Sequence, residues 1–144
     1  MISTVIVLFL VLESLNVLLL YFAPGSKKGN ALGVFKAFEK SKQDPQVHAL
    51  LKYLVNWVAG TKLIFILLLV VILIFGDEQL QIWSCVALVF SIMVFYWRLY
   101  PIMKSMDEKE ELDPKGYSKT LAIMIAFFVL CFALAVCWEL FFKT

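Results

Sequence analysis

Two charged residues, Glu13 and Lys62, stand alone inside long apolar stretches of the chain. Glu13 lies in the run 1–22 and Lys62 lies in the run 53–75. A lone charge inside lipid costs roughly 2.5–3.5 kcal/mol on insertion scales, so it requires a partner or a hydrated cavity. A carboxylate and an ammonium can neutralise each other, or each can attract a solute of opposite charge. These residue types therefore indicate either a structural ion pair or a binding site.

The elements that must position these charges are four apolar stretches at 2–22, 53–75, 80–100 and 119–142. Only 17 % of the 144 residues are charged, against about 25 % in soluble domains. Each stretch approaches the ~20 residues that cross a bilayer as a helix. They are continuously apolar, whereas membrane strands alternate. The sequence thus predicts an all-α integral membrane protein with a single domain, 1–144, built as an antiparallel bundle of four transmembrane helices.

The expected helices cover about 2–22, 45–75, 80–100 and 117–142. Asp44 and Pro45 suit the cap and the first position of the second helix. Between the first two helices, Leu32, Phe35 and Phe38 recur every three residues. This spacing predicts a short amphipathic helix over about 31–42 that lies in the cytoplasmic interface.

Eleven of the thirteen lysines and arginines fall in the segments 24–52 and 98–119. The positive-inside rule places both segments in the cytoplasm and both termini outside, in a plasma or bacterial inner membrane. We expect contact with anionic lipid head groups and no nucleic-acid partner. Lys27 and Lys28, in a glycine-containing turn, are candidate head-group ligands, and the alternative is ordinary loop lysines.

The depths of the polar residues can be compared from the 1.5 Å rise of a helix. Glu13 and Lys62 fall at the same level, whereas Asn56 and Arg98 fall ~12 Å nearer the cytoplasm. Ser84 and Ser91 recur with Arg98 at intervals of seven, and so share one face of their helix. We predict a polar seam, which serves either as an ion or substrate path or as a structural contact, formed by Glu13, Lys62, Asn16, Asn56, Arg98, Ser84 and Ser91.

Several chemistries lack the residues that they need. The chain has one histidine, no C-x-x-C motif and no aspartate inside an apolar stretch. We therefore expect no catalytic residue, no metal and no cofactor. The function predicted is a non-enzymatic homo-oligomeric channel or small ion or solute transporter, with a pore between protomers. One alternative is a structural or accessory subunit of a larger membrane complex, and another is a membrane enzyme that modifies lipid head groups.

Overall fold

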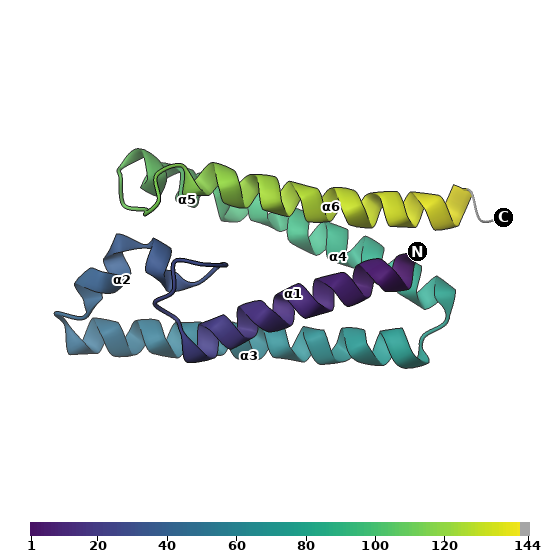
Figure 1. Cartoon of the computed structure of the whole chain (residues 1–144), viewed down its shortest axis with the longest axis horizontal. Coiled ribbons are helices and arrows are strands. Elements are labelled where there is room, and N and C mark those ends of the chain that lie inside the picture. The colour runs from purple at the N-terminus through teal and green to yellow at the C-terminus, as the bar shows by residue number, and fades with distance from the viewer. Residues whose placement is uncertain (142–144) are drawn as a thin grey trace.

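The computed structural model describes residues 1–141, which hold no β-strand. Their elements, in chain order, are α1 (Ile2–Phe22), the 3-10 turn η1 (Leu32–Val34), α2 (Lys36–Ser41), α3 (Pro45–Phe75), α4 (Glu78–Arg98), α5 (Tyr100–Glu108) and α6 (Tyr117–Phe141). The long helices run back and forth along one axis (Figure 1). The start of α1 lies at the same end of the molecule as the end of α6.

Helices α1 and α3 have the predicted bounds, and the start of α3 is set by its N-cap, Asp44. The Asp44 carboxylate accepts hydrogen bonds from the backbone N–H groups of Gln46 at 3.0 Å and Val47 at 3.2 Å. These bonds satisfy donors that the first turn of a helix leaves free. The last predicted helix also begins as expected at Tyr117, and its expected final residue, 142, lies outside the described residues.

The third helix differs from its prediction. It ends at Arg98, and a second helix, α5, follows at once from Tyr100. Pro101 stands in the first turn of α5, where a missing N–H leaves no hydrogen bond unmade. Much of the expected link 101–116 is therefore helical.

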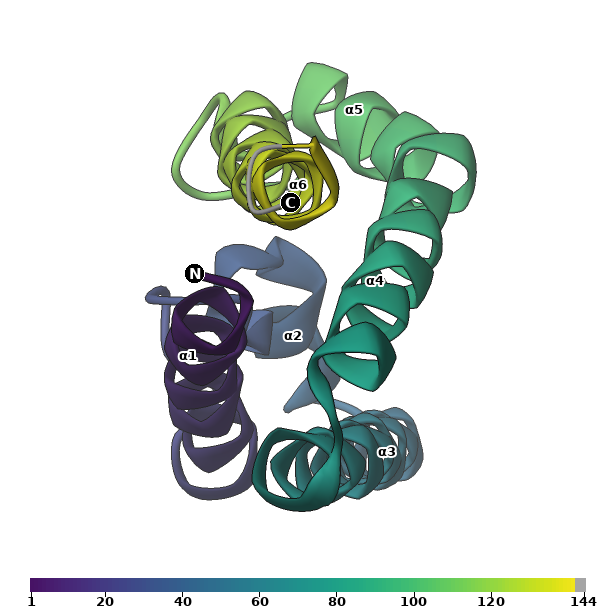
Figure 2. The same ribbon diagram turned by 90° about the vertical axis from the view of Figure 1, so that its right-hand side faces the viewer.

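The long helices form two pairs, α1 with α3 and α4 with α6 (Figure 1). Seen along the long axis, α4 leans across the molecule from α3 towards α5 and α6 (Figure 2). The pairs meet near the start of α1, where Ile6, Cys85 and Phe132 are fully buried. This packing closes one end of the molecule.

The segments 23–44 and 109–116 meet at the other end. Phe35 and Leu112 form an isolated antiparallel bridge, and Asp113 N–H donates to the Val34 carbonyl at 2.8 Å. The bridge requires extended backbone at Phe35, so the helix predicted over 31–42 is confirmed only in part: η1 comes first and the α-helix α2 covers Lys36–Ser41. Its position in the membrane interface stays a prediction. Phe38 is buried, with its ring 5.5 Å from that of His48 on α3.

Four candidate spans are long and apolar enough to cross a membrane, namely Ile2–Phe22, Pro45–Phe75, Glu78–Glu108 and Tyr117–Phe141. Within the chain, only 17–28 % of the most apolar window of each span is buried. Most of their large apolar side chains therefore face outwards.

Candidate functional site

Glu13 on α1 and Lys62 on α3 form an ion pair. The Lys62 ammonium donates to Glu13 Oε2 at 2.6 Å, and the Lys62 and Glu13 side chains are 22 % and 23 % exposed, respectively. Hydrogen bonds between ionised groups are short and strong. Because both side chains keep some exposed surface, the pair remains open to a third charged group.

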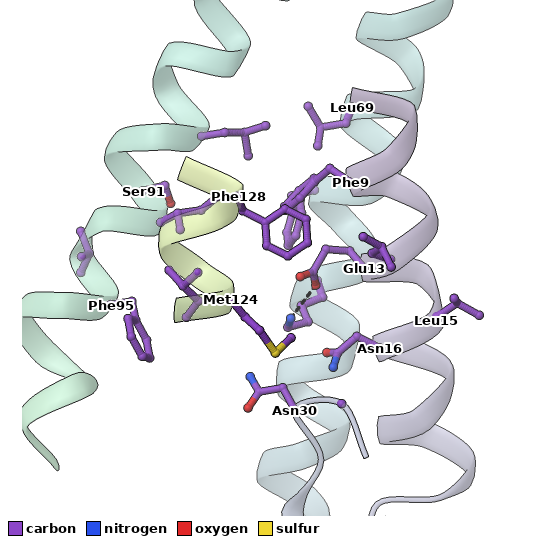
Figure 3. Close-up of a pocket in the computed structure, with 18 of the residues that line it drawn as sticks. Phe9, Glu13, Leu15, Asn16, Asn30, Leu69, Ser91, Phe95, Met124 and Phe128 are labelled. Carbon is purple, nitrogen blue, oxygen red and sulfur yellow. Dashed lines mark hydrogen bonds and ion pairs between the residues drawn. The ribbon is translucent and has the colours of Figure 1, made fainter. Parts of the chain in front are cut away.

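That exposed surface faces a cavity of about 890 Å³ between the pair α1/α3 and the pair α4/α6. Figure 3 shows Glu13 directed into it, with a dashed line to its partner. All of its lining residues belong to one chain, and it opens to the molecular surface, where Leu15, Leu68 and Leu99 are more than half exposed. Its size falls within the ~300–1,000 Å³ typical of pockets for small molecules.

The cavity wall is mainly aromatic and aliphatic. Phe9 on α1 meets Phe128 on α6 edge to face, with ring centroids 6.0 Å apart. Deeper in, Phe9 packs against the fully buried Phe132 at 5.3 Å. Phe95 and Met124 complete the wall on α4 and α6 (Figure 3). Such a wall suits the apolar part of a ligand.

Two asparagines add polar groups beside the ion pair. Asn16 lies one turn from Glu13 on α1, and its buried Oδ1 has no hydrogen-bond partner among residues 1–141. A buried acceptor left unpaired costs about 1–3 kcal/mol. Asn30 reaches the cavity from the segment after α1 (Figure 3). That segment is held in place by Tyr117, whose hydroxyl donates to the Gly29 carbonyl at 2.9 Å.

Two serines of α4 line the opposite wall. Ser84 Oγ donates to the Leu80 carbonyl of its own helix at 2.7 Å, as serine often does in an apolar helix. Ser91 lies two turns further along, with its hydroxyl on the cavity (Figure 3). The structure therefore brings together five residues of the predicted seam: Glu13, Asn16, Lys62, Ser84 and Ser91.

Asn56 and Arg98 lie apart from this cavity. Asn56 lines a separate, smaller cavity, because six residues turn it about 240° around α3 from Lys62. Arg98, at the end of α4, places its guanidinium 5.0 Å from the Trp97 ring. No hydrogen bond joins Asn56 to Arg98 within the described chain. The rise per residue predicts the level of each polar residue along its helix. It does not predict the direction in which the side chain points around the helix axis, which separates Asn56 and Arg98 from the cavity.

The closed end carries polar contacts that the sequence did not reveal. Glu139 of α6 accepts a hydrogen bond from the Ile2 backbone N–H at 3.2 Å and pairs with the amino group of Met1 at 2.9 Å. Ser3 Oγ donates to Oε1 of the buried Gln81 at 2.7 Å. These contacts join α1 to α6 and α4 beyond the cavity.

Lys27 and Lys28 lie on the segment after α1. Lys27 Nζ pairs with Asp113 Oδ2 at 2.5 Å. This hydrogen bond, together with the charge of Lys27, holds the pKa of Asp113 below its usual value. Lys28 is exposed, and its backbone N–H donates to Ser26 Oγ at 3.0 Å. A lipid contact at these lysines stays a prediction.

Metal ligands do not gather in the described residues, which contain no cluster of three or more His, Cys, Asp or Glu able to hold an ion. The three cysteines there are free. The site therefore consists of an ion pair, amides and hydroxyls on an apolar wall, and this set of groups can bind and orient a solute.

No protein-family model, no curated protein and no solved structure matches the chain.

Proposed function

We propose that the chain is an integral membrane protein whose four long helices cross the bilayer in alternating directions. Their outward apolar surfaces support this placement. Exposed tryptophans also occur at two levels, with Trp57 and Trp97 towards the end that carries α2 and α5, and Trp83 and Trp138 towards the closed end. Tryptophan favours the two membrane–water interfaces.

The orientation proposed has the α2 and α5 end in the cytoplasm. Both basic segments, 24–52 and 98–119, lie at this end, as Figure 1 lets the reader follow. The α3–α4 turn at Gly76 and Asp77, at the opposite end, carries no basic residue. This asymmetry supports a cytoplasmic α2 and α5 end in a plasma or bacterial inner membrane.

Within that membrane we propose that the protein is a small transporter for an amphipathic solute. The observation that carries this proposal is the Glu13–Lys62 pair on the wall of the 890 Å³ cavity. The apolar part of the solute would lie against the phenylalanines, and its polar head would lie beside the ion pair and Asn16. A channel between protomers is not required, since one chain supplies the cavity.

Each charge of the pair would bind a solute group of the opposite sign. A positive group on the solute attracts Glu13 and frees Lys62, whereas a negative group does the reverse. A zwitterionic head engages both charges and replaces one ion pair with two. For the solute to leave on the outer side, the helix pairs α1/α3 and α4/α6 must separate at the closed end near Phe132. For it to leave on the cytoplasmic side, the segment around Asn30 must move away from the cavity.

The test is solute uptake into proteoliposomes that contain the full chain. Octanoylcarnitine serves as a zwitterionic amphiphile, with octyltrimethylammonium and octanoate as counterparts of single charge. We expect wild-type protein to raise octanoylcarnitine uptake above that of protein-free vesicles. Glu13→Gln and Lys62→Met should each reduce this uptake about tenfold, because each removes one charge-assisted contact.

Lys40→Gln is the matched control, because Lys40 is an exposed lysine of α2 outside the cavity. It should leave uptake unchanged. If wild-type protein moves none of the three probes, and the Glu13 and Lys62 variants change only stability, the ion pair is structural. That outcome would favour an accessory subunit of a larger membrane complex.

A further inference from the structure

A second cavity, of about 240 Å³, lies outside the helix bundle between the end of α1, the first turns of α3 and the segment η1–α2. Its apolar wall is formed by Leu20, Leu32, Phe38 and Val55. It is separate from the 890 Å³ cavity beside Glu13 and Lys62, and none of the described residues lines both cavities. Its polar groups therefore form a set distinct from the one around Glu13.

Three exposed polar side chains line this cavity. Lys52 and Asn56 lie four residues apart on α3 and so share one face, and Tyr21 approaches from α1. Within residues 1–141, none of these side chains forms a hydrogen bond or an ion pair. One ammonium, one amide and one phenol can together donate several hydrogen bonds to a single acceptor group.

The Tyr21 hydroxyl lies beside Gly60, one turn beyond Asn56 on α3. A Cβ atom built on Gly60 would lie 3.6 Å from the Tyr21 hydroxyl, in ordinary van der Waals contact. The close approach of α1 to α3 at this glycine places the phenol beside the polar face of α3. The arrangement therefore depends on the packing of the two helices and not on a flexible loop.

The surroundings match the level of lipid head groups. Tyr53 and Trp57 flank the polar face of α3, are 64 % and 63 % exposed, and stack with ring centroids 6.4 Å apart. Exposed aromatic rings of this kind favour the membrane–water interface. Beyond Lys62 every residue of α3 is apolar, so an acyl chain can continue along this part of the helix.

We propose that this cavity binds the phosphate group of an anionic phospholipid on the cytoplasmic side. The Lys52 ammonium donates a charge-assisted hydrogen bond to one phosphate oxygen, and Asn56 and Tyr21 donate to the others. The acyl chains lie outside the cavity along α3, next to Trp57. This assignment requires the proposed membrane placement of α3, but it is independent of transport through the larger cavity.

The test is native mass spectrometry of the delipidated full chain in mild detergent, titrated with phosphatidylglycerol. Parallel titrations use phosphatidylcholine and inorganic phosphate. We expect one tightly bound phosphatidylglycerol per chain, weaker retention of phosphatidylcholine, and no competition by inorganic phosphate. Lys52→Gln should weaken phosphatidylglycerol binding at least about tenfold, and Lys52→Arg should restore most of it.

Lys40→Gln removes a neighbouring basic charge outside the cavity and should leave binding unchanged. Asn56→Leu keeps the branched shape of the side chain without its amide and should weaken binding several-fold, with an unchanged melting temperature. Equal losses in Lys40→Gln and Lys52→Gln would overturn the proposal, because they indicate a diffuse basic surface. Displacement of the lipid by inorganic phosphate would overturn the assignment to a lipid.

Membrane placement is checked separately by alkaline carbonate extraction. Protein that remains in the membrane pellet but fails to retain phosphatidylglycerol would contradict the lipid site alone. Protein released by the extraction would contradict the placement on which the site depends.

Discussion

At the scale of single residues, the Glu13–Lys62 pair is intermediate between a surface ion pair and a buried one. Surface pairs contribute about 0–1 kcal/mol, whereas breaking a buried pair costs about 3–5 kcal/mol. Each partner here is about one-fifth exposed and lies on the wall of a cavity. Hydration through that cavity should lower the cost of breaking the pair.

A double-mutant cycle measures this coupling. Glu13→Gln and Lys62→Met should each lower the free energy of unfolding by about 1–3 kcal/mol, since each leaves one charge without its partner. The double variant should lose less than the sum, because it removes both charges. The measurement is reversible unfolding in mixed micelles, and additive losses would show that the two residues are not coupled.

Outside the apolar helices, the Lys27–Asp113 contact should make stability depend on pH. Lys27 holds the pKa of Asp113 below its ordinary value, first through their hydrogen bond and second through its charge. This contribution is fully present above the unfolded pKa of aspartate, ~3.9. It is lost as the pH falls through the lower pKa of the folded state.

Thermal melting at a series of pH values checks this sign. Lys27→Gln should melt below wild type at pH 6, and the difference should disappear as the pH falls through the range in which Asp113 is protonated. Lys28→Gln, a change of the exposed neighbour, should show no such convergence. A Lys27→Gln difference that is constant down to the lowest pH would contradict a role for Asp113.

At the scale of elements, local signals predicted the helices that have clear ends. The cap at Asp44 and the proline after it gave the start of α3, and the proline and glycine after Phe22 gave the end of α1. In the region 31–42 the three-residue periodicity predicts one helix, whereas the α-helix covers only Lys36–Ser41 because the chain is extended at Phe35. The bridge between Phe35 and Leu112 joins residues far apart in the sequence, and no local pattern reveals it.

Gly33 is the residue on which that loop packing depends most. A Cβ atom there would lie 2.1 Å from the Gly25 carbonyl oxygen and 2.5 Å from that of Ser26, and neither backbone group can move freely. Gly33→Ala should therefore destabilise the protein by more than about 2 kcal/mol. The measurement is the unfolding free energy, together with hydrogen exchange of the Gly33 amide, which donates to Ser26 O at 3.1 Å.

Gly60→Ala is the matched control on α3. Its new Cβ meets only the Tyr21 hydroxyl at 3.6 Å, and alanine is favoured over glycine inside a helix by roughly 1 kcal/mol. This variant should be neutral or more stable. Equal behaviour of the two variants would contradict the packing described around Gly33.

At the scale of the whole molecule, the cavity arises from the way in which the two helix pairs meet. They close around Ile6, Cys85 and Phe132 at one end and separate towards the other. Composition and helix length predicted four spans and the depth of the charges. The separation of the pairs depends on which side chains interdigitate, so neither the cavity nor the position of Asn30 within it followed from periodicity.

The central claim is that the solute passes through this cavity, and a steric block tests it most directly. Ser91→Trp places a large ring in the cavity, whereas Leu130→Trp adds one to the exposed outer face of α6. In proteoliposomes we predict that Ser91→Trp lowers octanoylcarnitine uptake at least several-fold and that Leu130→Trp leaves it at the wild-type rate. Equal uptake by the two variants, with both folded, would contradict transport through the cavity.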